Sequence, residues 1–278
     1  MSGNSVINTN LKSLIAQDSS NINNRKLSTA MERLSTGNKI NSAKDDAAGL
    51  AISTRMDSQI RGLNMAVKNA YDTVSLTETA EGAMEEVTNM LQRMRELAVQ
   101  AANEGTMDTT ERGYLQQEFN TLRSELDRIV NVTEYNGQKL VDGTISAGID
   151  FQVGMNNTAN DRITLSLSAT TSTGLSIDTD SLATTSQAQA AIDALDTALA
   201  TINTERSTLG STQNRLQMTI SNLGNMYENM AASNSRLKDV DVAEETAKFT
   251  RNQILSQAAT SMLAQSNSLP QSALSLIG

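Results

Sequence analysis

The sequence predicts a mainly α-helical protein made of long antiparallel coiled-coil helices, with one small β-hairpin region. Apolar residues recur at alternating steps of three and four along most of the chain, which is the heptad pattern of a coiled coil. The 278 residues include one proline, and aromatic residues make up only 3%. A compact globule normally fills its interior with large rings. Here aliphatic residues and methionine must fill it, and they suit the narrow seams between long helices.

The composition excludes several classes of function. The chain has no cysteine and no histidine, so it lacks disulfides, thiolate metal sites and the commonest general base. Its net charge of −9 argues against a nucleic-acid partner, because phosphate binding requires a basic face. The first ten residues lack the basic and apolar regions of a signal peptide, and no apolar run approaches the ~20 residues that span a bilayer. We therefore expect no enzyme, no cofactor or metal site, and no membrane partner.

The first predicted helix runs from about Asn4 to Leu34. Gly37 follows as a stop signal at the C-cap position, and an irregular connector leads to residue 44. The second helix begins near Asp45 and Asp46, whose acidic side chains suit a helix N-terminus. Its apolar seam continues to residue 101, which corresponds to a helix roughly 80 Å long.

A shorter third helix is predicted over residues 108–129, folding back against the second as an antiparallel partner. From residue 132 the period changes to two. The alternation of apolar residues over residues 149–153 and 163–167 predicts a β-hairpin region within about residues 135–170. A Ser/Thr-rich run at about residues 166–186 has few large apolar residues and predicts an exposed loop or irregular crossover.

The fourth helix restores the heptads over residues 192–230, with Arg206 and Gln213 as polar interruptions of its seam. A break is expected at Ser233, Asn234 and Ser235. The last helix begins near residue 242, and its proline, at position 270, should bend or end its final turn.

Both ends of the chain therefore carry amphipathic helices that cannot bury all of their apolar surface alone. Pairing the two end helices covers one stripe of each, and the remaining apolar surface indicates an interface with another molecule. We predict self-assembly through the apolar residues of both ends. They are Ile7, Leu11, Leu14, Leu27 and Leu34 in the first helix, and Phe249, Leu255, Met262 and Leu269 in the last.

Four sequence blocks then suggest a family. They read NSAKDDAAGLAI at residues 41–52, LQRMRELAVQAAN at 91–103, EYNGQKL at 134–140 and LPQSALSLI at 269–277. Each resembles a block of bacterial flagellin, and together they lie in both terminal thirds of the chain. The middle lacks distinctive matches and is short, so the chain looks like a flagellin without the outer variable domains.

The resemblance implies a structural subunit of the flagellar filament, secreted through the flagellar type III apparatus to the outside of the cell. It implies two coaxial domains, each formed from both chain ends: an inner domain of residues 1–44 and 236–278, and an outer helical domain of residues 45–235. The implied partners are other copies of the chain, the flagellar cap and hook-associated proteins, and an export chaperone at the C-terminus.

The resemblance also implies a partner in the host. Some flagellins bind the flagellin-sensing Toll-like receptor through matching Arg, Leu and Glu positions, and the same face meets neighbouring subunits. The corresponding residues here are Gln92, Arg93, Arg95, Glu96, Leu97 and Glu118. Read from the residues alone, this is a solvated helix surface.

Three other functions compete with the filament subunit. A hook–filament junction protein has similar termini and differs in stoichiometry. A soluble immune ligand or adhesin would keep its activity after deletion of residues 242–278. An enzyme finds no support, because the carboxylate pairs Asp45–Asp46, Glu85–Glu86 and Glu244–Glu245 point about 100° apart on their helices and fit helix caps or solvated faces.

Overall fold

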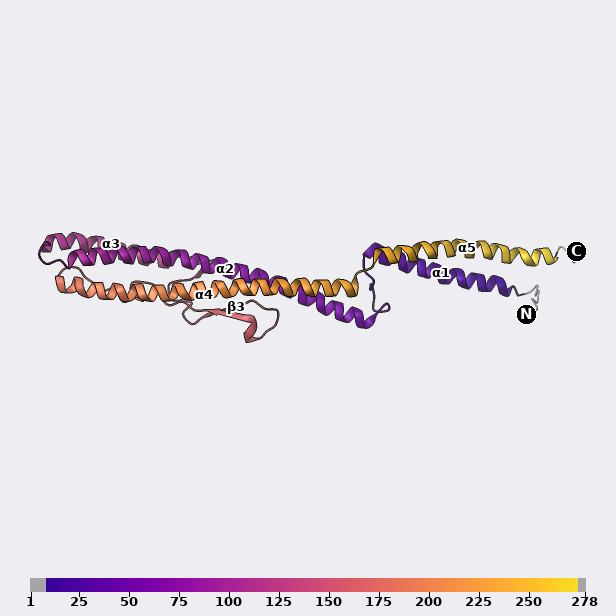
Figure 1. Ribbon diagram of the computed structural model, residues 1–278, viewed down its shortest axis with the longest axis horizontal. Helices are drawn as coiled ribbons and strands as arrows, with labels where there is room; N and C mark the ends of the chain where they lie inside the picture. The colour runs from indigo at the N-terminus through magenta and orange to yellow at the C-terminus, as the bar shows by residue number, and fades with distance from the viewer. Residues whose placement is uncertain (1–8, 275–278) are drawn as a thin grey trace. The chain divides into compact units, whose positions relative to one another are not determined.

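The structure, a computed structural model, describes residues 9–274 and the side chains of residues 9–268. Most of this range is helical, which confirms the predicted fold class (Figure 1). The helices are α1 (Leu11–Thr36), α2 (Ala47–Ala101), α3 (Thr109–Val132), α4 (Thr185–Lys238) and α5 (Val242–Leu274). The short elements are β1 (Glu134–Tyr135), β2 (Gln138–Lys139), β3 (Ile149–Gln152), the 3₁₀ turn η1 (Ala159–Asp161) and β4 (Arg162–Leu165).

The chain divides into two compact units. The terminal unit combines residues 1–58 with residues 229–278, and the central unit comprises residues 59–228. Each unit is thus built from segments on both sides of the hairpin region. The sequence prediction placed the boundaries at residues 44 and 236 instead, where the helices begin or end, whereas the structural division falls within the long helices α2 and α4.

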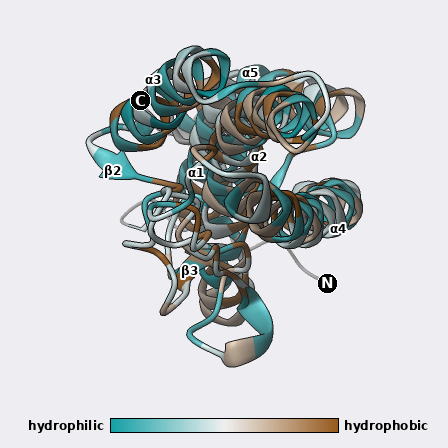
Figure 2. Ribbon diagram, turned by 90° about the vertical axis from the view of Figure 1, so that its left-hand side faces the viewer, coloured by the Kyte–Doolittle hydropathy of each residue, from teal (hydrophilic) through white to brown (hydrophobic). Residues whose placement is uncertain are grey.

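The core of the central unit follows the predicted seams. Its buried residues on α2 lie at helical spacing and include Met84, Leu91 and Met94, none of which is exposed. Phe119 and Leu126 of α3 and Leu195 of α4 pack into the same cluster. Figure 2 shows hydrophilic and hydrophobic residues alternating along the helix ribbons, as expected of helices that bury one face each. Arg206, a predicted interruption of the seam, pairs with Glu81 at 2.8 Å.

Two antiparallel hairpins occupy the region between α3 and α4. In the first, β1 pairs with β2 through Asn136 and Gly137, which both have positive φ, as a type I′ turn requires. In the second, β3 pairs with β4, so that Phe151 lies opposite Ile163. This second hairpin confirms the predicted strand pair, and its buried Ile163 and Leu165 face the helices.

Of the two forms expected for the Ser/Thr-rich run, the structure shows the irregular crossover and not the exposed loop. Residues 166–184 are irregular, but Leu167, Leu175, Ile177 and Leu182 are buried in the central core. These four apolar anchors hold the segment against the helices, and buried Thr170 donates its hydroxyl to the carbonyl of Val141 at 2.9 Å. The segment is therefore a packed crossover.

Three helix boundaries differ from the prediction. Residues 9 and 10 are not helical, and Asn10 caps α1 by accepting a hydrogen bond from the Ser13 amide. The expected break at residues 233–235 is absent, because the Asn234 side chain donates to Asp57 at 2.6 Å and does not compete with the helix backbone. The backbone of α5 also continues past position 270 to Leu274.

Candidate functional site

The terminal unit pairs α1 with α5 side by side and antiparallel, as Figure 1 shows. Polar contacts join the two helices along their length. The Asn10 amide donates to the Ser266 carbonyl at 2.8 Å, and the Ser256 hydroxyl donates to Asn24 at 2.8 Å. Small residues such as Ala30 and Ala259 lie buried between the helices, so the two backbones approach closely.

This pairing leaves most of the apolar surface of the two helices uncovered. Within the described residues of the terminal unit, the buried hydrophobic side chains are those of Ala30, Ile40 and Ala259. The large hydrophobic side chains left exposed on the two helices are Leu11, Leu14, Ile15 and Met31 of α1, and Val242, Ile254, Leu255 and Met262 of α5. Exposed apolar area of this extent marks an interaction surface.

The residues predicted to drive self-assembly fall into three groups. Leu11, Leu14, Leu255 and Met262 are exposed. Leu27, Leu34 and Phe249 are half-buried between or beside the helices. Ile7 and the side chain of Leu269 lie outside the described residues. Ile15 belongs to the apolar face predicted for the first helix, whereas Ile254 was not predicted; both side chains are exposed.

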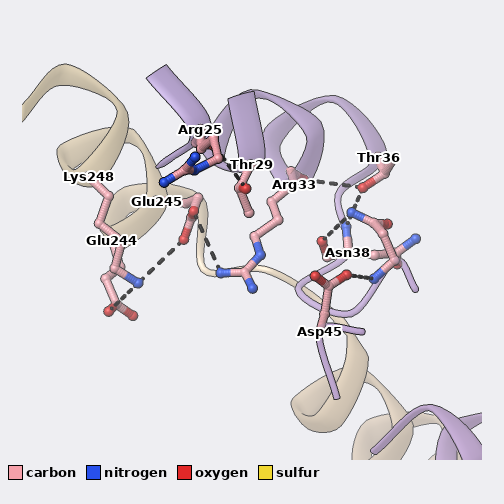
Figure 3. A network of polar contacts seen from close by, with 10 residues as sticks. Arg25, Thr29, Arg33, Thr36, Asn38, Asp45, Glu244, Glu245 and Lys248 are labelled. Atoms are coloured by element: carbon pink, nitrogen blue, oxygen red, sulfur yellow. Dashed lines mark hydrogen bonds and ion pairs between the residues drawn. The ribbon is translucent and has the colours of Figure 1, made fainter. Parts of the chain in front are cut away.

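A polar network crosses the pair at the end nearest the connectors (Figure 3). Glu245 of α5 is buried and lies 3.9 Å from Arg33 of α1 and 3.4 Å from Lys248. Hydrogen bonds from Lys248 to Glu244, at 2.8 Å, and to Glu245 raise the pKa of Lys248. Glu244 and Glu245 lie in the first turn of α5, which agrees with the expected helix-capping role, whereas a solvated face is ruled out for Glu245 because it is buried.

The connectors beside this network pair with each other. The Lys39 amide donates to the Lys238 carbonyl at 2.6 Å, and the Val240 amide donates to the Gly37 carbonyl at 2.9 Å. Asp45 accepts from the Ser42 hydroxyl at 2.9 Å, and this bond is the largest of the contacts that lower the pKa of Asp45. Asp45, just before the start of α2, thus stabilises the conformation of the connector through hydrogen bonds.

The residues predicted to contact a receptor or a neighbouring subunit lie in the central unit. Arg93 donates to Glu118 of α3 at 2.9 and 3.0 Å and to Glu96 at 2.9 Å. These bonds, that to Glu96 first, raise the pKa of Arg93. On the same helix, Arg95 pairs with Asp196 of α4 at 2.6 Å, and Gln92 is exposed. Four of the six predicted residues are thus exposed, and Arg95 is half-buried.

Leu97 is the exception. Its side chain is 1% exposed and packs in the central core with Met94 and Ala98. Residues four apart on a helix are offset by about 40°, which is enough to turn Leu97 from the side of Arg93 into the seam. The expectation that Leu97 offers an exposed contact is corrected accordingly.

Neither a metal-binding cluster nor a membrane-spanning helix is found among the described residues. They contain no group of three or more His, Cys, Asp or Glu side chains placed to hold a metal ion. Among the described helices, none combines the length and apolar character that crossing a membrane requires.

Comparison with known proteins agrees with this picture. The profile of the bacterial flagellin N-terminal helical region matches residues 7–146, and that of the bacterial flagellin C-terminal helical region matches residues 192–277. A flagellin of Halalkalibacterium halodurans is 44% identical over 272 residues, covering 98% of this chain and 99% of that protein.

Two solved structures are also similar. The crystal structure of Bacillus cereus flagellin is 35% identical with a TM-score of 0.50, covering 60% of this chain and 94% of that one. A putative flagellar hook-associated protein from Vibrio parahaemolyticus has a TM-score of 0.58, covering 70% of this chain and 100% of that one, but is only 14% identical. The latter is a likeness of fold alone.

Proposed function

Because this chain belongs to the bacterial flagellin family, it is a structural subunit of the flagellar filament and not an enzyme, and we propose that it polymerises by burying the exposed faces of α1 and α5 against other copies. One observation carries the proposal. The terminal unit buries three small or medium apolar side chains in its described part and leaves eight large ones exposed on the paired helices. A helix pair with so small a core gains its remaining stability from its neighbours.

Polymerisation of full-length and truncated protein tests this proposal. The full chain should form filaments visible by negative-stain microscopy after salting-out, and a variant lacking residues 242–278 should not. Helicity measured by circular dichroism should rise on polymerisation, because neighbours supply the burial that the end helices lack. Filaments formed equally well by the truncated variant would contradict the proposal.

We propose the further partners and the export route on the basis of the same family membership. The filament lies outside the cell, and the subunit reaches it by type III export with an export chaperone bound at the C-terminal helix. At the filament ends it meets the cap and the hook-associated proteins. The exposed Val242, Ile254 and Leu255 of α5 support this, because one apolar face offers a chaperone the surface that is later covered in the filament.

Recognition of the free subunit by the host flagellin-sensing Toll-like receptor is the second function we propose. The exposed cluster of Arg93, Glu96 and Glu118 supports it, since a charged surface spanning two helices suits recognition by a protein partner. Reversal of the charge by Arg93→Asp should abolish receptor signalling by monomer. Arg128→Asp is the matched control, because Arg128 is similarly exposed and forms a comparable pair with Glu125. Unchanged signalling by Arg93→Asp would contradict the assignment.

The junction-protein alternative has weaker support. The nearly full-length likeness at 44% identity is to a flagellin, whereas the hook-associated protein shares the fold alone. Copy number separates the two, since a filament subunit occurs thousands of times along the filament and a junction protein forms a single ring.

A further inference from the structure

We propose that a groove between α1 and α5 of the terminal unit is a binding site for a condensed phosphate, that is, an oxyanion made of several linked phosphate groups. The site lies within one subunit and requires no second copy, so the inference goes beyond the proposed function. It is based on the number of cations that line the groove, on how few of them have a partner, and on their spacing.

The groove is lined by residues of both helices and has a volume of about 440 Å³. Figure 3 shows Arg25 and Arg33 on α1 and Lys248 with Glu245 on α5. Glu245 supplies the one carboxylate of the lining, so the groove is strongly basic. The lining cations are Arg25, Lys26, Arg33, Lys248 and Arg251.

Most of these cations lack a carboxylate partner. Glu245 lies 3.9 Å from Arg33 and 3.4 Å from Lys248, and Lys248 is also held by Glu244 at 2.8 Å. The other three cations form no ion pair with any side chain that the structure describes; they are Arg25, Lys26 and Arg251.

Arg33 has hydrogen-bond donors that none of the described residues satisfies. Its side chain is only 25% exposed, and its Nε atom is buried without a partner. The 3.9 Å between its Nη1 atom and Glu245 is an ion-pair distance and too long for a hydrogen bond. A buried donor without a partner is costly, and an oxyanion in the groove would accept from it. The half-buried Asn252, whose amide can also donate, lines the same groove.

The charge of the groove contrasts with that of the rest of the chain. The two end helices together hold six basic and four acidic residues, whereas residues 37–241 hold 16 basic and 27 acidic residues. The net charge is thus +2 on the helix pair against −11 on the rest. A polyanion is repelled by most of this protein, so the field of the protein directs it to the groove.

The spacing of the cations favours linked phosphates over a single ion. Arg25 and Arg33 are eight residues apart, or about 12 Å along the helix axis, so a chain of phosphates reaches both without drawing the two side chains together. Three of the five cations are arginines, whose planar guanidinium groups match phosphate oxygens in bidentate hydrogen bonds. An acidic peptide would bring backbone amides that need partners of their own, whereas linked phosphates carry charge on every unit.

Binding should stabilise the pairing of α1 with α5. The described part of the terminal unit buries only the apolar side chains of Ala30, Ile40 and Ala259, so apolar burial contributes little to the pair. The lining cations repel one another in the empty groove, and an anion between them removes that repulsion. A ligand that binds only the paired form shifts the equilibrium toward it. Condensed phosphate should therefore raise the helicity of the free subunit.

Calorimetric titration of the full-length chain with tripolyphosphate tests the site. Binding should be saturable, and circular dichroism should show a parallel rise in helicity. Lys26→Gln and Arg251→Gln remove exposed cations of the groove and should each weaken binding about fivefold or more, because hydrogen bonds between charged groups are the strong ones. Lys12→Gln is the matched control, since Lys12 is an exposed lysine of α1 that does not line the groove. Its Kd should stay within about twofold, because distant exposed charges are screened.

Three outcomes would overturn the site. The first is the absence of saturable binding, and the second is an equal loss of affinity in Lys12→Gln and Lys26→Gln, which would indicate attraction by overall charge. The third is an equal rise in helicity with sodium sulfate at the same ionic strength, which would indicate a general effect of salt. A tetraglutamate peptide that binds more tightly than tripolyphosphate would overturn the choice of phosphate in favour of an acidic peptide.

Hydrogen exchange of the natural chain covers the case in which a variant fails to fold. Tripolyphosphate should slow amide exchange in α1 and α5 and leave the core of the central unit unchanged, because the lining belongs to the terminal unit alone. Unchanged exchange in α1 and α5 would also contradict the site. Filament formation by the natural chain is measured separately, so failure of the phosphate site leaves the proposed function intact.

Discussion

Removing the exposed apolar surface at the start of α1 should strongly weaken polymerisation. Leu11, Leu14 and Ile15 are 65%, 53% and 60% exposed in the single subunit. Complete burial of such a side chain contributes about 1.5–3 kcal/mol, so covering the exposed part of each contributes about 1–2 kcal/mol. Their joint replacement by serine should then cost roughly 3–5 kcal/mol per subunit, and since about 1.4 kcal/mol corresponds to a factor of ten, the critical concentration should rise by roughly 100- to 4000-fold.

The assay is sedimentation of seeded filaments over a range of protein concentrations. The control is the triple variant Leu11→Met, Leu14→Met and Ile15→Leu, which keeps the apolar area and should polymerise within a few-fold of the natural chain. Thermal unfolding of the central unit should be the same in both variants, since the substituted residues lie outside its core. A serine variant that polymerises at the natural critical concentration would refute the reasoning.

Three further predictions concern stability and are measured by calorimetry. Phe119 is fully buried in the central core, so Phe119→Ala should cost about 3–5 kcal/mol and lower the melting temperature of the central unit; an unchanged melting temperature would contradict the packing. Burial raises the pKa of Asp180 from its ordinary value of 3.8, so its stability contribution is complete below that value and is lost as pH rises through the raised value. Asp180→Asn should therefore match the natural chain at low pH and be the more stable at neutral pH, and the reverse order would be inconsistent with this assignment. A Cβ added at Gly49 would lie 2.7 Å from Cδ1 of Ile40, so Gly49→Ala should destabilise the terminal unit by about 1–3 kcal/mol; Gly82→Ala, where nothing lies within 4 Å, should be neutral or stabilising.

Helical periodicity was sufficient to predict the long elements. The α2 seam through Met84, Leu91 and Met94 is buried as its spacing implied, because a heptad repeat identifies the face of a helix without reference to its partner. The turn at Asn136 and Gly137 was equally readable, since it requires positive φ at both residues. Local sequence rules gave the wrong secondary structure where a residue far away in the sequence provides a hydrogen-bond partner. Asn234 reads as a helix breaker, yet it stays helical because its amide is satisfied by Asp57.

The two candidate interaction surfaces were likewise predicted only in part from the sequence. The apolar ends of the chain were evident as helical stripes, and Arg93, Glu96 and Glu118 were identified through the family resemblance. Their pairing, and the burial of Leu97, depend on how α3 packs on α2, which a one-dimensional pattern does not specify. The groove lined by Arg25, Arg33 and Lys248 was not predicted at all, because its cations come from two helices separated by more than 200 residues.

By itself, the sequence determined that this protein is a set of long one-sided helices with unsatisfied apolar stripes at both ends and no chemistry for catalysis. Those properties follow from residue type and spacing, which act locally. Only the tertiary structure decided which stripe residues remain exposed after α1 meets α5, and where charge collects between them. Exposure and electrostatic potential depend on the positions of residues far apart in the chain, and these positions exist only once the helices have packed.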